Sequence, residues 1–386
     1  MRWVFWILGA LLIVVAVAGV TFALKPRLYL LTFGGVGVAV LAAYCAVWFR
    51  GTRTGNVCIS FVAIGLFLSL LDPYVLLTEA RELTSFEGSW TYKYYYVDDR
   101  DLGYVPQAGI IAESRKYFGD HLDYDVTYSI DANGHRLTAA SSDPGADNVL
   151  FMGDSFTFGM GLNDDQTLPQ LFSKFTDGRY NVINFGVPNY GLHQVVRSLE
   201  TGRAHSLLAK GKVYIVYTAI ADHARRAAAA HAWGAQGPDY ELDDDGMAIY
   251  RGNLHSAFAR TIVKILYRSL FFSHFVLPRV SENAVQNPVP LYIGLVKRAR
   301  QLAEEIYHAA FIMIFWDDNE PLEPRVKAAL DEAKIAYIPI TAIIPDVLAK
   351  SSIYRITPMD GHPTEAANRL IAAYLAKRFG DGTIAQ

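Results

Sequence analysis

The sequence predicts an α/β protein: a three-layer α/β/α sandwich around a parallel sheet, preceded by N-terminal transmembrane helices. From residue 149 onward, short and nearly continuous apolar segments alternate with longer segments of helical periodicity. Continuous apolar strands are typical of parallel strands buried on both faces, and their alternation with helices predicts helices on both sides of the sheet. Before residue 80, by contrast, apolar stretches follow one another almost without charge.

These N-terminal stretches occupy residues 3–24, 28–49 and 57–71. A helix needs roughly 20 apolar residues to cross a bilayer. The first two stretches are that long, and the third, interrupted by Asp72 and Pro73, could be completed by the apolar residues after them. Buried core helices are the alternative, but the stretches show no amphipathic face. We therefore expect residues 1–79 to form a membrane anchor of three transmembrane helices, in a multi-pass membrane protein.

Charge and cysteine content exclude several classes of function. Basic residues are almost equally distributed on the two sides of the expected spans, so they do not set the orientation. The net charge is −3 and no basic cluster is present, which argues against a nucleic-acid partner. Both cysteines, Cys45 and Cys58, lie in expected spans, so the rest of the chain has no disulfide and no thiol ligand. Metal-ligand spacings and nucleotide-binding motifs are also missing, and we expect no cofactor and no metal.

Residues 80–148 are expected to form a linker and a β-rich lead-in. The segment WTYKYYYV (90–97) is aromatic and β-prone, and suits a strand or an aromatic belt at a membrane surface better than a sugar-stacking platform. Farther along, the pair Asn133-Gly134 predicts a hairpin turn.

Residues 149–386 are expected to form the main domain. The predicted strands are 149–152, 180–185, 212–219, 310–316 and 336–340, and the predicted helices are 165–176, 191–209, 290–309, 322–334 and 364–379. The alternation breaks between residues 222 and 287, which predicts an insertion. Within it, DYELDDDGMAIYRG predicts a hairpin with an acidic, solvated turn that lacks calcium-loop spacing.

The segment VLFMGDSFTFGMG (149–161) places Ser155 directly after the first strand of this domain. Ligands of a parallel α/β sheet bind beyond the carboxyl ends of its strands, and the neighbouring glycines permit a tight turn. Ser155 is therefore a candidate nucleophile. The alternative is an ordinary turn that the serine caps.

Two other segments could complete a site. In PMDGHP, Asp360 lies two residues before His362, and residues i and i+2 of an extended segment face the same side. Asp360 could then orient His362 as the base for Ser155, as in a Ser-His-Asp triad; alternatively, Asp360 caps the following helix. The segment NVINFGVPNYG around Asn189 could supply backbone N–H donors to an oxyanion, or be a plain turn.

The succession of GDSFTFG, NFGVPNYG and DGHP resembles the SGNH/GDSL hydrolase superfamily over about residues 147–380. The resemblance implies an SGNH/flavodoxin-like fold with Ser155 as nucleophile, His362 as base and Asp360 as its partner. It also implies oxyanion donors at the backbone of Ser155 and, by alignment, Asn189. The asparagine that the family carries in its third block is missing, because Ala221 stands near its place. His223 could replace it as an oxyanion donor.

The sequence thus predicts a membrane-anchored serine ester hydrolase, an esterase or deacetylase, acting on acylated envelope glycans or lipids. One alternative is an SGNH-type O-acyltransferase on envelope polysaccharide, which would need a membrane partner protein because three spans are too few to carry acetyl groups across a bilayer. Another is a degenerate, non-catalytic domain that binds glycan or scaffolds a membrane complex. The resemblance to envelope enzymes predicts a bacterial inner-membrane location with the main domain outside the cytoplasm.

Overall fold

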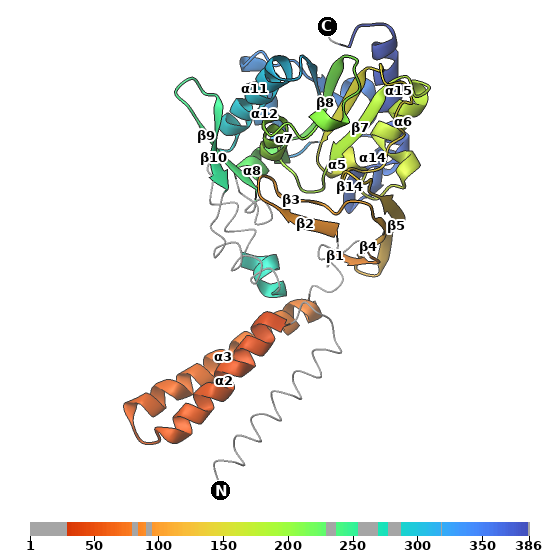
Figure 1. The fold of residues 1–386 in the computed structure, drawn as a ribbon. Helices are drawn as coiled ribbons and strands as arrows, with labels where there is room; N and C mark the ends of the chain where they lie inside the picture. Colours follow the sequence, from red (N-terminus) through yellow and green to blue (C-terminus); the bar gives the residue numbers. More distant parts are fainter. Residues whose placement is uncertain are drawn as a thin grey trace. The chain divides into compact units, whose positions relative to one another are not determined.

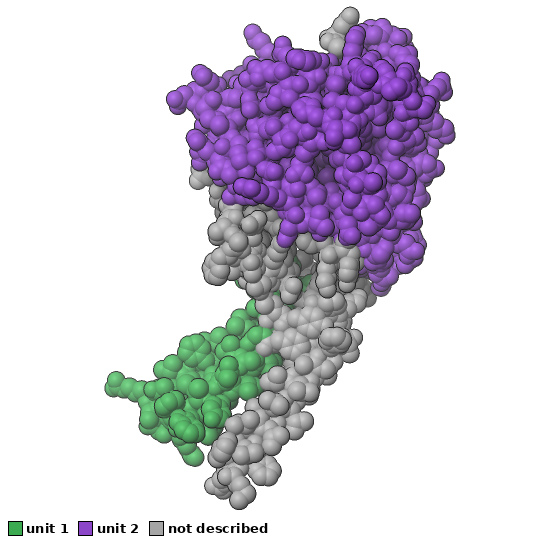
Figure 2. Space-filling model, in the orientation of Figure 1, with its two compact units in different colours: residues 1–83, 255–282 green, residues 84–254, 283–386 purple. Residues whose placement is uncertain are grey.

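The computed structural model describes residues 29–78, 84–89, 95–228, 237–253, 269–276, 287–317 and 319–384. The chain divides into two compact units, which Figure 2 colours separately. One unit comprises residues 1–83 and 255–282, and the other comprises residues 84–254 and 283–386. The β-rich lead-in therefore belongs to the same compact unit as the domain that follows it.

A five-stranded parallel sheet forms the centre of the second unit (Figure 1), as predicted. Its strands, in the order β12-β11-β8-β6-β7, are β12 (Ile338–Pro339), β11 (Ala310–Trp316), β8 (Val213–Ile220), β6 (Asn148–Gly153) and β7 (Asn181–Gly186). Successive residues of β6 enter different cores: Leu150 packs in one apolar cluster, and Val149 and Phe151 pack in the other. Such two-sided burial explains why the strand sequences are continuously apolar.

Helices cover both faces of this sheet. Residues of α7 (Leu192–Glu200), α8 (Asp222–Ala227), α11 (Val289–Glu305) and α12 (Glu323–Glu332) join the first cluster, and residues of α6 (Leu168–Phe175) and α15 (Glu365–Gly380) join the second. The prediction of one helix over 191–209 was wrong in its extent. The helix ends at Glu200, Gly202 takes a φ of +68°, and a 3₁₀ turn (His205–Leu207) follows.

The lead-in is β-rich, in two small antiparallel sheets. β1 (Thr84–Glu87), β4 (Ile111–Phe118) and β5 (His121–Ser129) form one, and β2 (Tyr96–Asp99) and β3 (Gly103–Pro106) form the other. Of the aromatic segment 90–97, residues 90–94 lie outside the described residues, and Tyr96 and Val97 belong to β2. The predicted turn at Asn133-Gly134 is present, closed by an antiparallel bridge between Ile130 and Arg136.

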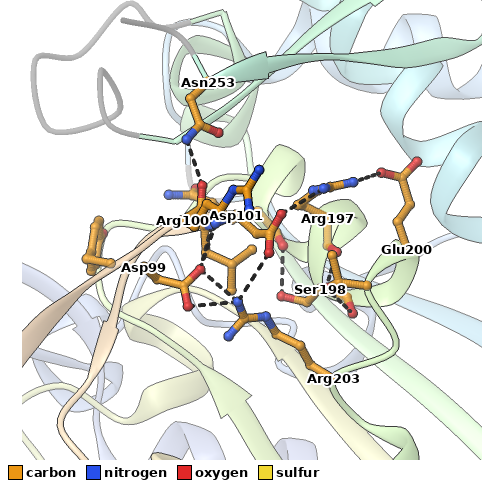
Figure 3. A network of polar contacts seen from close by, with 12 residues as sticks. Asp99, Arg100, Asp101, Arg197, Ser198, Glu200, Arg203 and Asn253 are labelled. Carbon is orange, nitrogen blue, oxygen red and sulfur yellow. Dashed lines mark hydrogen bonds and ion pairs between the residues drawn. The ribbon is translucent and has the colours of Figure 1, made fainter. Parts of the chain in front are cut away.

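Ion pairs fasten the β2–β3 hairpin to the end of α7 (Figure 3). Arg203 pairs with Asp99 at 2.7 Å, and Arg197 pairs with Asp101 at 2.7 Å. Asn253, in the strand pair β9 (Pro238–Leu242) and β10 (Ala248–Asn253), donates a hydrogen bond to the Arg100 carbonyl oxygen at 2.7 Å. That strand pair is the hairpin with an acidic turn that the sequence predicts. Each pair is partly exposed and weak alone, but together they fix the lead-in against the sheet domain.

The described residues of the first unit include the helices α2 (Tyr29–Trp48) and α3 (Arg53–Thr78), which pack against each other, and a short π-helix (Phe272–Val276). Helices α2 and α3 approach most closely at Gly35 and Gly65. A Cβ atom on Gly35 would lie 2.4 Å from the Gly65 carbonyl oxygen, and one on Gly65 would lie 2.5 Å from that of Gly35. Ala39 and Ser69 follow these glycines by one helical turn each and also border the contact. Small residues four apart on both partners are typical of helix packing within membranes.

One described helix, Arg53–Val75 within α3, is long and apolar enough to cross a membrane, with a mean hydropathy of 2.0. The apolar part of α2, Gly34–Trp48, is shorter, and the first predicted span lies outside the described residues. Of the three predicted spans, the described residues thus show one helix of sufficient length and apolarity, and the other two stay predictions. Large apolar side chains remain exposed on both helices, among them Leu41, Val47, Ile59, Phe67 and Leu70.

The helix α3 continues through Pro73, where the sequence suggested an interruption. Asp72, one residue earlier, is fully buried. Its carboxylate accepts hydrogen bonds from the Ser269 hydroxyl at 2.7 Å and from the Phe271 backbone N–H at 2.9 Å. A buried carboxylate in an apolar helix thus attaches a segment of the predicted insertion to this unit.

Replacing Gly35 by leucine is expected to separate α2 from α3, because the side chain would collide with the α3 backbone. Overpacking of this kind costs about 1–3 kcal/mol, which predicts roughly tenfold faster proteolysis within residues 29–78 of the detergent-solubilised chain. Gly37→Leu is the matched control, since no atom lies within 4 Å of a Cβ there. Equal cleavage rates in the two variants would contradict the close contact.

Candidate active site

Ser155 lies at the carboxyl end of β6, an inner strand of the sheet between β8 and β7. Strand β6 ends at Gly153, and Asp154 caps the short helix α5 (Ser155–Phe158) by accepting a hydrogen bond from the Phe156 N–H. Gly153 takes a φ of +154°, and a Cβ there would lie 2.4 Å from the Thr157 hydroxyl oxygen. Only glycine fits this turn without displacing a neighbour. The turn holds the Ser155 side chain beyond the carboxyl ends of the strands, where ligands of parallel α/β sheets bind.

The structure brings together the three residues that the sequence proposed as a triad. Ser155 Oγ lies 2.8 Å from His362 Nε2, and His362 Nδ1 contacts Asp360 Oδ1. Asp360 and His362 both lie in β14 (Asp360–Pro363), and the backbone N–H of His362 also donates to Asp360 Oδ1 at 3.0 Å. The N-cap of α15 is Thr364, so Asp360 is not the helix cap of the alternative interpretation.

Lys116 is a third partner of this carboxylate, from strand β4. Its ammonium nitrogen lies 2.7 Å from Asp360 Oδ2 and 3.2 Å from Asp123 Oδ2. Burial raises the pKa of Asp360, but the hydrogen bond and charge of His362, and then those of Lys116, outweigh burial and hold this pKa well below its usual range. Asp360 is therefore ionised at neutral pH. No motif in the sequence points to Lys116, which is 244 residues away from Asp360 along the chain.

Asn189 lies in a tight turn at the carboxyl end of β7, next to β6 in the sheet. The turn is closed by a hydrogen bond from the Tyr190 N–H to the Val187 carbonyl oxygen at 3.1 Å, and Asn189 takes a φ of +67°. Asparagine tolerates this left-handed conformation better than most residues. The Tyr104 hydroxyl of the lead-in donates to the Pro188 carbonyl oxygen at 2.8 Å and so supports the turn.

The loop after Ser155 is held by a buried arginine. Arg136 donates to the carbonyl oxygens of Phe158, Gly159 and Leu162 and pairs with Asp164 at 2.8 Å. Its guanidinium also stacks over the rings of two neighbours at 4.4 and 4.8 Å, those of Tyr128 and Phe158. Like Lys116 and Tyr104, Arg136 comes from the segment before residue 149, so the lead-in helps to build the site.

His223, the predicted replacement oxyanion donor, is engaged elsewhere. It is fully buried, its Nδ1 lies 2.6 Å from the Tyr217 hydroxyl, and its Nε2 lies 3.2 Å from Asp154 Oδ2. Its Nδ1 is therefore engaged with Tyr217, whereas its Nε2 lies near the Asp154 carboxylate without a hydrogen bond among the described residues. This placement argues against His223 as a donor to a substrate. Ala221, in the place of the family's asparagine, offers no side-chain donor either.

Among the described residues, no group of three or more histidine, cysteine, aspartate or glutamate side chains could hold a metal ion. The groups that do come together are the Ser155 hydroxyl, the His362 imidazole and the ionised Asp360 carboxylate, which are joined by hydrogen bonds. Such an arrangement can activate a serine for attack on an acyl carbonyl.

No protein-family model and no curated protein matches the chain. Solved structures similar to the chain include the following three. The first is a lipolytic protein of the G-D-S-L family from Desulfitobacterium hafniense DCB-2; the sequence identity is 12%, the TM-score is 0.36, and the match covers 60% of this chain and 98% of the other. The second is an arylesterase from Agrobacterium tumefaciens str. C58; the sequence identity is 12%, the TM-score is 0.34, and the match covers 61% of this chain and 99% of the other. The third is an acetyl xylan esterase, Est2A, from Butyrivibrio proteoclasticus; the sequence identity is 11%, the TM-score is 0.32, and the match covers 75% of this chain and 87% of the other. At this identity and these TM-scores, the likenesses assign no activity to this chain.

Proposed function

We propose that this protein is a membrane-anchored serine ester hydrolase of the SGNH/GDSL type. The observation that supports the proposal most directly is the chain of contacts from Ser155 through His362 to Asp360 at the carboxyl end of strand β6. The sequence motifs GDSFTFG and DGHP carry these residues in the order that the superfamily uses.

Ser155 is the proposed nucleophile and His362 its base. As the Ser155 oxygen attacks the ester carbonyl carbon, its proton passes to His362 Nε2, and Asp360 stabilises the imidazolium that forms. Collapse of the tetrahedral intermediate breaks the bond to the alcohol, which leaves with the proton from His362. Water then attacks the acyl-enzyme by the same steps, giving the carboxylic acid and free Ser155.

Two backbone N–H groups are the proposed oxyanion donors. Ser155 is the first residue of α5, so its N–H has no acceptor within that helix. Asn189 occupies the third position of its turn, where the N–H does not take part in the closing hydrogen bond. Because β6 and β7 are adjacent and parallel, the two turns lie at the same end of the strands, their carboxyl end. A third, side-chain donor is missing at Ala221.

The helix pair α2–α3 is the proposed membrane anchor, and the first apolar stretch of the sequence would add a third span. The contact through Gly35 and Gly65 and the apolar side chains exposed on both helices support this proposal. An anchored ester hydrolase would act on substrates held at the cell envelope, so acylated glycans or lipids outside the cytoplasm are the proposed substrates. Transfer of the acyl group to a sugar, in place of water, would use the same residues.

Labelling with a fluorophosphonate tests the proposal. We expect the full-length chain in detergent to react at Ser155, as located by mass spectrometry, and to hydrolyse p-nitrophenyl acetate. Ser155→Ala should abolish both signals. A sugar acceptor that captures the acyl group faster than water would identify a transferase. A folded chain without labelling at Ser155 would support the non-catalytic alternative and contradict the proposal.

A further inference from the structure

Arg226 connects the two turns that carry the proposed oxyanion donors. It lies in α8, directly after the sheet strand β8. Its Nη1 donates to Asp154 Oδ2 at 2.8 Å and to the Tyr190 carbonyl oxygen at 2.9 Å. Asp154 is the residue before Ser155, and Tyr190 is the residue after Asn189. One nitrogen atom therefore holds both turns.

This contact is a buried ion pair that remains charged. The Arg226 side chain is one-tenth exposed and that of Asp154 is fully buried. Burial raises the pKa of Asp154, but the charges of His223 and Arg226 lower it well below its usual range. Burial lowers the pKa of Arg226, and Asp154 and Asp222 raise it above its ordinary value. Removing the Arg226 guanidinium would leave the fully buried Asp154 carboxylate without its charged hydrogen-bond donor, which is costly in free energy.

Two further contacts restrict the movement of Arg226. Its Nε donates to Asp222 Oδ2 at 2.8 Å, which orients the plane of the guanidinium. On its other side, a Cβ atom added to Gly191 would lie 2.9 Å from Arg226 Cβ. The turn that contains Asn189 thus packs directly on the stem of the Arg226 side chain.

We propose that Arg226 is a positioning residue, which fixes the spacing between the backbone N–H groups of Ser155 and Asn189. This inference rests on the proposed function. An oxyanion donor is effective only within about 2.7–3.1 Å of the developing charge, and these two donors lie on separate turns. Because Ala221 offers no side-chain donor, stabilisation of the oxyanion depends on these two backbone donors alone. A rigid connection between the two turns keeps the donors at the required spacing. Arg226 acts through the two turns and does not itself contact the substrate.

The experiment compares Arg226→Gln and Arg226→Lys with Arg225→Gln in the full-length chain. Arg225 is the matched control, since it lies next to Arg226, is about one-third exposed, and within the described part of the chain forms an ion pair only with Asp222. For both Arg226 variants we expect kcat for p-nitrophenyl acetate, per titrated active site, to fall about 10- to 100-fold, a range below the loss of one oxyanion donor. KM should change less than about twofold. Arg226→Lys keeps the buried charge and so provides the test if Arg226→Gln does not fold.

Hydrogen–deuterium exchange gives a second readout that does not depend on activity. The Arg226 variants should lose protection in residues 153–158 and 186–191, whereas Arg225→Gln should not. An unchanged kcat per active site in the Arg226 variants, with or without a raised KM, would overturn the positioning role. Unchanged hydrogen–deuterium exchange in the two turns would overturn it as well. If the wild-type chain is inactive but exchange changes as expected, the proposed ester hydrolysis fails while the connection by Arg226 stands.

Discussion

His362→Ala is expected to lower kcat/KM for p-nitrophenyl acetate by at least about 10⁴-fold, because removal of a triad base leaves the serine hydroxyl without a proton acceptor. In the structure, His362 Nε2 lies 2.8 Å from Ser155 Oγ. Among the described residues, no other imidazole or carboxylate forms a hydrogen bond with this hydroxyl. Fluorophosphonate labelling of Ser155 should slow by a similar factor, since phosphonylation also needs the alkoxide-like serine.

The control for this variant is His121→Ala. His121 begins β5 and is exposed, and its replacement should leave both rates within about twofold of the wild type, as is usual for surface substitutions. Labelling of Ser155 at the wild-type rate in folded His362→Ala would contradict the role of His362. Equal loss in both variants would indicate that folding, and not the base, was damaged.

The sequence predicted the parts of this molecule that depend on local pattern. Continuous apolar segments predicted all five strands of the sheet, because a strand buried on two faces has no polar side. Ser155, Asp360 and His362 were also predictable, since each lies in a short motif whose geometry follows from a tight turn or from i, i+2 spacing. The Asn189 turn was predicted for the same reason.

Residues that contact the site from outside any recognisable motif were not predictable. Lys116 reaches Asp360 only because the lead-in packs on the same unit as the sheet, and the sequence suggested a separate segment there. Arg226 was overlooked because the motif comparison pointed to His223, three residues earlier in α8. The direction of a side chain on a short helix depends on the packing of its neighbours, and here His223 faces Tyr217 and Asp154.

The membrane anchor could be predicted only in part from the sequence, for a different physical reason. Hydropathy measures composition along the chain, whereas a span also requires a helix of sufficient length. Among the described residues, the second apolar stretch forms α2, whose apolar part is Gly34–Trp48, and the third forms α3, which continues beyond Asp72. The Asp72 carboxylate accepts hydrogen bonds from Ser269 and Phe271. The close approach at Gly35 and Gly65 depends on both helices together and is not visible in either stretch alone.

Asp360→Asn is expected to lower kcat by about 10³- to 10⁴-fold while leaving KM nearly unchanged. In the wild type, the ionised Asp360 accepts from His362 Nδ1, so the imidazole keeps its proton there and presents a bare Nε2 to Ser155. An asparagine amide that donates to Nδ1 would favour the tautomer with the proton on Nε2, which cannot accept the proton of Ser155. A loss smaller than tenfold in a folded variant would show that Asp360 does not set this tautomer.

Lys116 provides the partner variant for this test. Lys116→Met should lower kcat only about tenfold, because Asp360 keeps its contact with His362 and loses one charge-assisted hydrogen bond. If Lys116 acts only through Asp360, the double variant should be no slower than Asp360→Asn alone, within about threefold, since coupled residues are not additive. Losses that multiply in the double variant would instead mean that Lys116 acts on the reaction independently, through Asp123 and the packing of the lead-in.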